Sequence, residues 1–188
     1  MGFLTDILSR TLFRSTFRGI DCLLEDVRAG NPIPKTEPDP KSGALSINGS
    51  TLVYASPDYG SWQILISEIA AFGEYTTENG PMIDDWFMVF VTNDFNWVEA
   101  SNYCSGCDGV RDQLAKHWGA EGLCGSLALS TNFSSRAIWP VTIAGKPLFT
   151  FIERHQSTWD KVGSFGVGLI DKDLTPEVRQ SLQPIEAK

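Results

Sequence analysis

Alternating apolar and polar residues predict a series of β-strands in the middle of the chain. Leu45 and Ile47 alternate with polar residues before the turn pair Asn48-Gly49, and a second alternating stretch follows, which predicts an antiparallel hairpin over residues 44–55. Further strands are expected in a segment containing Trp62, Ile64 and Ile66 and at residues 69–76, 85–92 and 96–101. Residues 85–92 contain an unbroken apolar run, so this strand is predicted to be central and covered on both faces.

Helical periodicity begins after these strands. A helix is expected to start near Asp108 and to stop at Gly119. His117 falls on the same face as Val110 and Leu114, so its side chain is expected to be packed. Strands are then predicted at 136–143, 147–153 and 165–170, followed by a short helix over 176–182 with Thr175 as its N-cap and Pro176 as its first residue. This order, an antiparallel meander closed by a helix, indicates the α+β class.

The pattern divides the chain into four segments. These are an N-terminal helical segment (1–28), a Pro-rich linker (29–43), the main α+β domain (44–139) and a C-terminal extension expected to pack on the same domain (140–188). The N-terminal helices are a candidate contact between the two subunits of a homodimer. The longest apolar run, Trp86 to Val91, is far shorter than the ~18 residues of a membrane-spanning helix, so no membrane span is expected.

Charge is distributed unevenly over the 188 residues. The formal net charge is −8, and all of it falls in residues 44–139, because both flanking segments contain equal numbers of acidic and basic side chains. No Lys, Arg or His occurs between Lys41 and Arg111. Binding to nucleic acid is not expected, because it requires clustered basic side chains. A segment of this kind attracts cationic partners instead.

Aromatic side chains are interspersed with these acids. Four aromatic residues are expected to stay partly exposed beside these acids: Tyr59, Tyr75, Phe95 and Trp97. A Lys or Arg of a partner would form ion pairs with the acids and cation–π contacts with the rings. The candidate binding residues are Tyr59, Glu74, Tyr75, Glu78, Asp84, Asp85, Asp94, Phe95 and Trp97. The leading hypothesis is therefore a non-enzymatic protein-interaction module that binds a basic protein partner. A structural homo-oligomer is an alternative.

The pair Cys104-x-x-Cys107 provides an alternative in a different class. Such a pair at a helix start is typical of a redox couple or of half a zinc site, and the carboxylates near Asp84 and Asp85 are a further candidate for a small enzyme. His117 lies about ten helical residues beyond Cys107, or ~15 Å, too far for a shared tetrahedral ion. The competing interpretation is a simple turn with two semi-buried thiols. We expect no cofactor and no metal.

Other sequence signals favour a non-enzymatic cytoplasmic protein. No Gly-x-Ser-x-Gly motif accompanies either histidine, so a hydrolytic triad is not expected. The N-terminal residues do not match a secretory signal, and a cytoplasmic location with reduced cysteines is predicted.

One stretch resembles a known group of proteins. Thr76-Thr77-Glu78-Asn79-Gly80-Pro81, followed by Asp85-Trp86-Phe87, is similar to the T-T-x-x-G-P-x-x-x-D-φ-φ pattern of a group of uncharacterised bacterial proteins. The resemblance covers about residues 44–139. It implies a pleckstrin-homology-like partial barrel capped by a helix, and it implies no activity. Lipid-binding pleckstrin-homology domains carry basic residues in a strand loop; this chain lacks them, so phosphoinositide binding is not implied.

Overall fold

The computed structural model of the protein describes residues 38–78, 84–127, 130, 132–153 and 170–183, all within the unit Pro38–Lys188. The predicted N-terminal helices and their dimer contact, residues 29–37 of the linker and most of the strand expected at 165–170 lie outside the described residues. Within the described ranges, no helix is long and apolar enough to cross a membrane.

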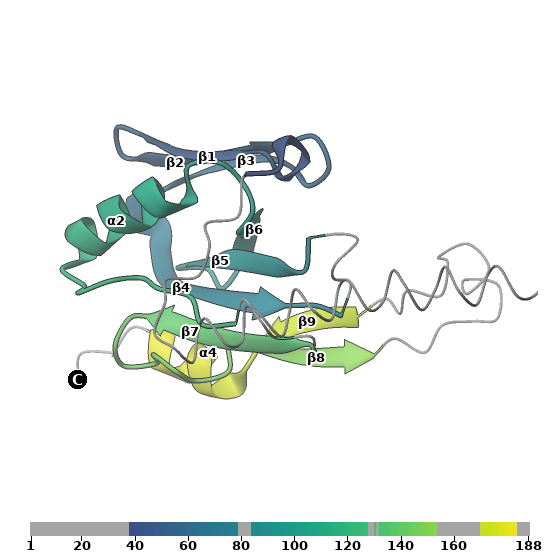
Figure 1. The fold of residues 1–188 in the computed structure, drawn as a ribbon. Helices are drawn as coiled ribbons and strands as arrows, with labels where there is room; N and C mark the ends of the chain where they lie inside the picture. Colours follow the sequence, from purple (N-terminus) through teal and green to yellow (C-terminus); the bar gives the residue numbers. More distant parts are fainter. Residues whose placement is uncertain (1–37, 79–83, 128–129, 131, 154–169, 184–188) are drawn as a thin grey trace, which may run out of the picture. The chain divides into compact units, whose positions relative to one another are not determined.

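A three-stranded antiparallel sheet begins the described chain (Figure 1). It consists of β1 (Ala44–Asn48), β2 (Thr51–Ser56) and β3 (Gly60–Leu65), with the 3-10 helices η1 (Pro40–Ser42) before it and η2 (Ile66–Glu68) after it. The predicted hairpin over 44–55 is confirmed, with Asn48 paired to Thr51 across the turn. Ile66 starts η2 and does not extend the third strand, so the predicted common face ends at Ile64.

The central sheet has four strands in the order β6-β5-β4-β7, and every neighbouring pair is antiparallel. The strands are β4 (Ile69–Thr76), β5 (Trp86–Thr92), β6 (Trp97–Ser101) and β7 (Ser134–Trp139). The predicted strand at 136–143 is wrong beyond residue 139, because Pro140 has no N–H to continue the ladder and the chain turns there, with the Ile143 amide donating to the Pro140 carbonyl at 3.1 Å.

Strand β5 confirms that the central sheet is covered on both faces. Met88 and Phe90 point into one hydrophobic cluster, while Phe87, Val89 and Val91 point into another. The alternation follows directly from the period-two geometry of a strand. Both faces of β5 pack in a hydrophobic core, so the residues on both faces are apolar and the apolar run is continuous.

Helix α2 (Cys107–Trp118) covers the first face together with the sheet β1-β2-β3. The helix ends at Gly119, which adopts the left-handed conformation, so its predicted extent is confirmed. His117 is exposed, and the prediction that it packs is wrong. The buried stripe is centred on Cys107 and Leu114, which leaves residue 117 at the edge of the stripe, where a polar ring remains in water.

The second face is covered by the C-terminal elements. Strands β8 (Phe149–Glu153) and β9 (Ile170–Leu174) form an antiparallel pair, and helix α4 (Pro176–Leu182) follows them. Phe149, Leu174 and Val178 belong to the second hydrophobic cluster. The Thr175 hydroxyl accepts a hydrogen bond from the Val178 amide at 3.4 Å, so the predicted N-cap and helix are confirmed.

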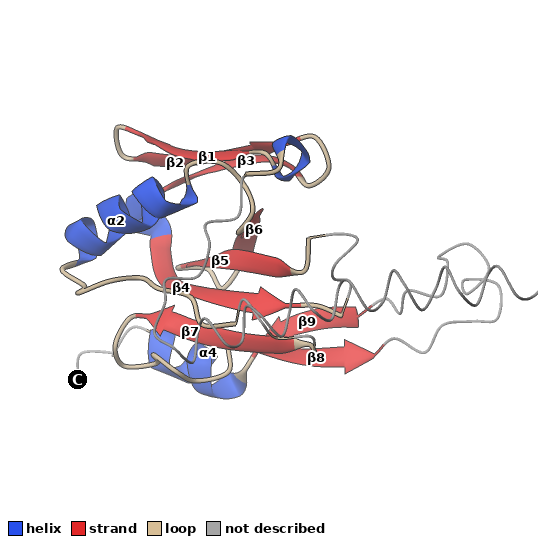
Figure 2. Cartoon of the chain, in the orientation of Figure 1, coloured by secondary structure: helices blue, strands red, loops and turns tan. Residues whose placement is uncertain are grey.

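The described residues thus form an α+β fold dominated by antiparallel strands (Figure 2). In the described part of the chain the strands form three separate sheets, with three, four and two members, and no closed barrel is present.

Candidate functional site

A group of polar and aromatic side chains gathers where β5 begins, β6 ends and α2 starts. We call it the Trp86 cluster; its members are Asp84, Asp85, Trp86, Asn102, Tyr103 and Arg111. Adjacent antiparallel strands bring the start of β5 next to the end of β6, so the Asn102 amide donates to the Trp86 carbonyl at 3.0 Å. The guanidinium of Arg111 lies 5.7 Å from the centre of the Trp86 ring.

Hydrogen bonds fix several of these side chains. The Tyr103 hydroxyl donates to Asp85 Oδ1 at 2.7 Å, and Arg111 donates to the side-chain oxygen of Asn102. Arg111 also lies 3.6 Å from the exposed carboxylate of Asp108. Burial and the neighbouring Asp85 raise the pKa of Tyr103 above its usual value, so Tyr103 is a hydrogen-bond donor at neutral pH.

Unsatisfied buried atoms mark the Trp86 cluster. Asp84 Oδ2, Asn102 Nδ2 and Arg111 Nε are buried and have no hydrogen-bond partner among the described residues. A buried polar atom without a partner costs about 1–3 kcal/mol, so such atoms normally bind water or a ligand. The orphan on Asp84 is a carboxylate oxygen, which is an acceptor and prefers a charged donor.

Tyr59 borders the Trp86 cluster beside Asp84. Its ring packs edge-on against Phe87 with the ring centres 5.4 Å apart, and the residue is half-buried. Burial, followed by the negative charge of Asp84, raises the pKa of Tyr59 to about 12. The structure therefore brings together three of the predicted binding residues: Tyr59, Asp84 and Asp85.

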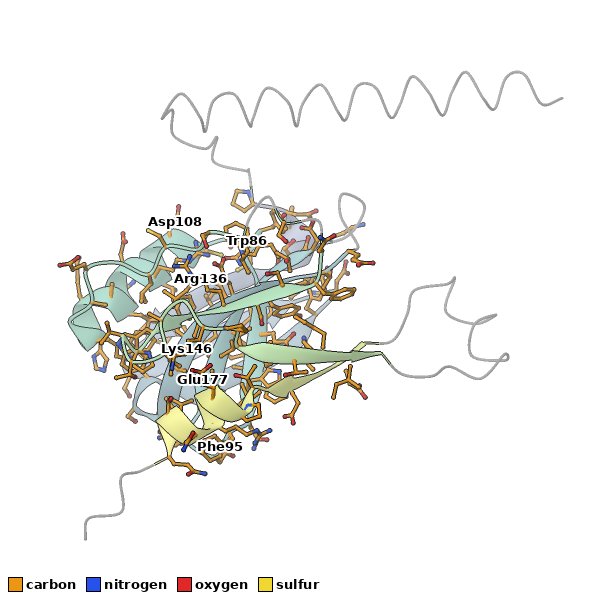
Figure 3. All side chains as sticks on the ribbon, turned by 90° about the horizontal axis from the view of Figure 1, so that it is seen from below. Trp86, Phe95, Asp108, Arg136, Lys146 and Glu177 are labelled. Atoms are coloured by element: carbon orange, nitrogen blue, oxygen red, sulfur yellow. The ribbon has the colours of Figure 1, made fainter. Side chains whose placement is uncertain are left out.

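Glu74 is not on the surface. It is 1% exposed and accepts hydrogen bonds from the Trp86 indole N–H at 2.7 Å and from the Ser126 amide at 2.7 Å. Arg136, opposite Glu74 on β7, donates to the Ser126 hydroxyl (Figure 3 labels Trp86 and Arg136). Glu74 therefore tethers the segment around Ser126 to the central sheet and is not available to a partner.

Tyr75 is also buried, at 5% exposure, so the expectation that it stays partly exposed is wrong. Its hydroxyl donates to Glu99 Oε2 at 2.5 Å. Glu99 Oε1 accepts from Trp97 Nε1 at 2.8 Å and from Lys172 Nζ at 2.6 Å. Lys172 lies 3.8 Å from the centre of the Tyr75 ring. The cation–π partner of Tyr75 therefore comes from this chain itself, from strand β9.

Asp94, Phe95 and Trp97 lie at the opposite end of the β5–β6 pair from the Trp86 cluster. Asp94 is in the turn between β5 and β6, where Asn96 Nδ2 donates to its Oδ2 at 2.6 Å and hydrogen bonds from Thr92 and Asn96 lower its pKa. Phe95 has Arg179 5.9 Å from its ring centre. Glu78 is exposed beyond the end of β4 and follows Thr77, whose amide donates to the Asp85 carbonyl at 2.8 Å, so it lies near the Trp86 cluster. The predicted set is therefore not one surface.

Several residues of these sites were not among those predicted from the sequence: Lys172, Arg111, Asn102, Tyr103 and Glu99. By the alternation of side chains along β9, Lys172 lies on the same face as the buried Leu174. That alternation was a usable signal for a lysine facing the core. Arg111 carried no comparable signal, because its contact with Trp86 depends on how α2 follows β6.

The tyrosines predict an alkaline loss of stability. All four tyrosines of the chain have a raised pKa in the folded state, chiefly because of burial. Above pH 10.0, their ordinary value, the unfolded chain loses protons that the folded chain keeps, so rising pH favours unfolding. Buried Tyr75 alone lowers the free energy of unfolding by about 1.4 kcal/mol per pH unit above that value.

Lys172 changes the pH dependence of stability in the opposite direction and over a lower pH range. Burial lowers its pKa, so its contribution to stability increases as pH rises toward 10.5 and is constant above that value. We therefore expect urea unfolding to show a steep fall in stability above about pH 10.5, with a shallower slope in Tyr75→Phe. Equal slopes in the two proteins, or tyrosines of the folded chain that ionise near pH 10 by ultraviolet absorbance, would contradict this assignment.

No family model, no curated protein and no solved structure matches this chain. The function is therefore argued from the residues and their geometry.

Proposed function

We propose that the protein is a non-enzymatic interaction module and that it binds an arginine or lysine side chain of a basic protein partner at the Trp86 cluster. The observation that carries this proposal is the carboxylate oxygen Asp84 Oδ2, which is buried without a hydrogen-bond partner among the described residues. A guanidinium or ammonium group supplies the charged donor that this oxygen lacks.

The charges around the Trp86 cluster support a cationic ligand. Asp84 and Asp85 are two carboxylates against one cation of the cluster, Arg111, which also lies 3.6 Å from the carboxylate of Asp108. Basic side chains of the C-terminal elements already have acidic partners: Lys172 pairs with Glu99, Arg179 with Asp173, and Lys146 with Glu177 at 2.9 Å.

Aromatic rings give the Trp86 cluster its second component. The rings of Trp86 and Tyr103 meet edge to face with their centres 6.4 Å apart, and Tyr59 borders Asp84. A planar guanidinium uses both features, because it donates to carboxylates in a fork and stacks on aromatic faces. Arginine is therefore the favoured ligand over lysine.

We propose further that the fold is a partial barrel of the pleckstrin-homology type. The support is the succession of the antiparallel strands β1 to β6 followed by α2, which packs on the first hydrophobic cluster.

Calorimetric titration with an arginine-rich peptide tests the binding proposal. The variant Asp84→Asn with Asp85→Asn is expected to weaken binding about tenfold or more, since a charge-assisted pair contributes more than 1.4 kcal/mol. The control variant Asp112→Asn with Glu121→Gln removes the same net charge from exposed positions on and after α2. Equal weakening in both variants would show non-specific attraction to a negative protein and would contradict the proposal.

A further inference from the structure

Two thiols lie close together beside the Trp86 cluster. Cys107 is the first residue of α2 and Cys104 lies in the turn before it, and their sulfur atoms are 3.0 Å apart. Both residues belong to the first hydrophobic cluster, with 4% of Cys104 and 6% of Cys107 exposed. Cys124, the third described cysteine, is exposed.

Backbone contacts with β1 hold this turn in place. The Ser105 amide donates to the Gly43 carbonyl at 2.9 Å, and the Leu45 amide donates to the Ser105 carbonyl at 2.9 Å. Gly106 adopts φ +85°, with its Cα against the Leu45 carbonyl. The two sulfur atoms are therefore brought together by the fold of the surrounding backbone, and not only by their own attraction.

The environment assigns different protonation to the two thiols. The hydrogen bond between the two sulfur atoms and the positive charge of Arg111 lower the pKa of Cys107. The same hydrogen bond, with burial, raises the pKa of Cys104. Cys107 is also the first residue of α2, where the helix dipole favours a thiolate, so it is taken as the nucleophile of the couple; in its protonated form its thiol donates to the Cys104 carbonyl at 2.9 Å.

We propose that Cys104 and Cys107 form a reversible dithiol–disulfide couple that is oxidised by hydrogen peroxide. The Cys107 thiolate attacks one peroxide oxygen; an S–O bond forms, the O–O bond breaks, and the leaving hydroxide takes up a proton to give water. Cys104 sulfur then attacks the sulfenic sulfur of Cys107; an S–S bond forms, the S–O bond breaks, and the departing hydroxide takes the proton of Cys104 to give a second water. Two thiols lose two electrons and the peroxide gains them.

The burial of the couple selects the oxidant. Both residues are almost fully buried, with 4% of Cys104 and 6% of Cys107 exposed, and this favours a small oxidant over a protein disulfide. Zinc is less well supported than a redox couple, because within the described ranges no three or more His, Cys, Asp and Glu side chains are grouped to hold a metal ion. This proposal does not depend on the proposed binding of a basic partner.

The test uses the full chain with Cys22→Ser and Cys124→Ser, so that only the couple remains. After treatment with hydrogen peroxide, peptide mass spectrometry is expected to show the loss of two hydrogen atoms from the peptide that contains both cysteines, and dithiothreitol is expected to reverse it. Oxidation is expected at least about tenfold faster in the folded chain than in the same chain in urea, because the folded chain holds the two sulfurs together.

Single variants separate the two roles. In Cys104→Ser, Cys107 is expected to accumulate as sulfenic acid, which dimedone traps once the oxidised chain is unfolded in urea, whereas in Cys107→Ser the remaining thiol is expected to react slowly. A folded chain that oxidises no faster than the unfolded chain, or that gains oxygen at either cysteine without losing hydrogen, would overturn the proposal. If a single variant fails to fold, the comparison of oxidation rates in the folded and unfolded chains still tests the proposal.

Discussion

Replacing Glu74 with alanine is expected to lower the free energy of unfolding by about 3 kcal/mol. The side chain is 1% exposed, and its two oxygens accept from the Trp86 indole, the Ser126 amide and, at 3.4 Å, the Leu127 amide. Alanine leaves these donors without an acceptor and leaves a cavity. A surface substitution changes the free energy of unfolding by only a few tenths of a kcal/mol. The loss is larger here because buried donors lose a charged acceptor.

Glutamine at this position is not a conservative change. Both carboxylate oxygens of Glu74 accept from N–H groups, so the amide NH₂ of Glu74→Gln must face a donor in either orientation. We expect a loss of about 2 kcal/mol. Urea unfolding of the wild type, Glu74→Ala and Glu74→Gln measures both values, with Glu121→Ala as the exposed control. Stabilities within about 0.5 kcal/mol of the wild type would contradict the buried network.

Gly106→Ala is expected to cost about 3 kcal/mol, for two separate reasons. The residue has φ +85°, a conformation that costs a residue with a Cβ about 1–2 kcal/mol. A Cβ at this position would also overlap the backbone oxygen of Leu45, which cannot move without disturbing β1. Forcing extra atoms into a packed site typically adds 1–3 kcal/mol.

Gly119→Ala separates these two contributions. Gly119 caps the other end of the same helix with φ +63°, and a Cβ there meets nothing within 4 Å. This control is expected to lose only about 1 kcal/mol, the conformational part alone. Equal losses in the two variants, measured by urea unfolding, would show that the contact between the Cys104–Cys107 turn and β1 contributes nothing.

Local patterns were sufficient to predict the elements whose limits are set by nearby residues. The hairpin at Asn48-Gly49 depends on a turn pair, and the helix that begins at Pro176 depends on the Thr175 cap. Both signals act within a few residues along the chain. They were therefore visible in the sequence before any tertiary contact was known.

The misplacement of Glu74 and Tyr75 has a non-local cause. Glu74 and Tyr75 of β4 were predicted at a binding surface, but β7, some sixty residues later, pairs with β4, and the segment around Ser126 covers Glu74. Lys172 of β9 then covers Tyr75 from the C-terminal extension. A pattern read along one strand does not contain the identity of its later neighbours, so the burial of these two residues could not be predicted.

The candidate site was predictable only in its acidic half. Asp84 and Asp85 were identified because they lie in a segment without basic residues. Asn102 and Arg111 join them through the ladder between β5 and β6 and through the turn into α2. Residue types alone do not specify that turn, so the polar half of the Trp86 cluster emerged only from the structure.

Chemical-shift mapping with an arginine-rich peptide is the most direct test of the proposed binding site. Backbone amide signals of the isotope-labelled full chain are recorded as the peptide is added at low salt, where charge attraction is least screened. If the peptide binds at the Trp86 cluster, the largest shifts occur at Tyr59, at Asp84 to Trp86 and at Asn102 to Tyr103. Shifts confined to exposed acids elsewhere, such as Asp112 and Glu121, or the absence of shifts would contradict the proposed binding site.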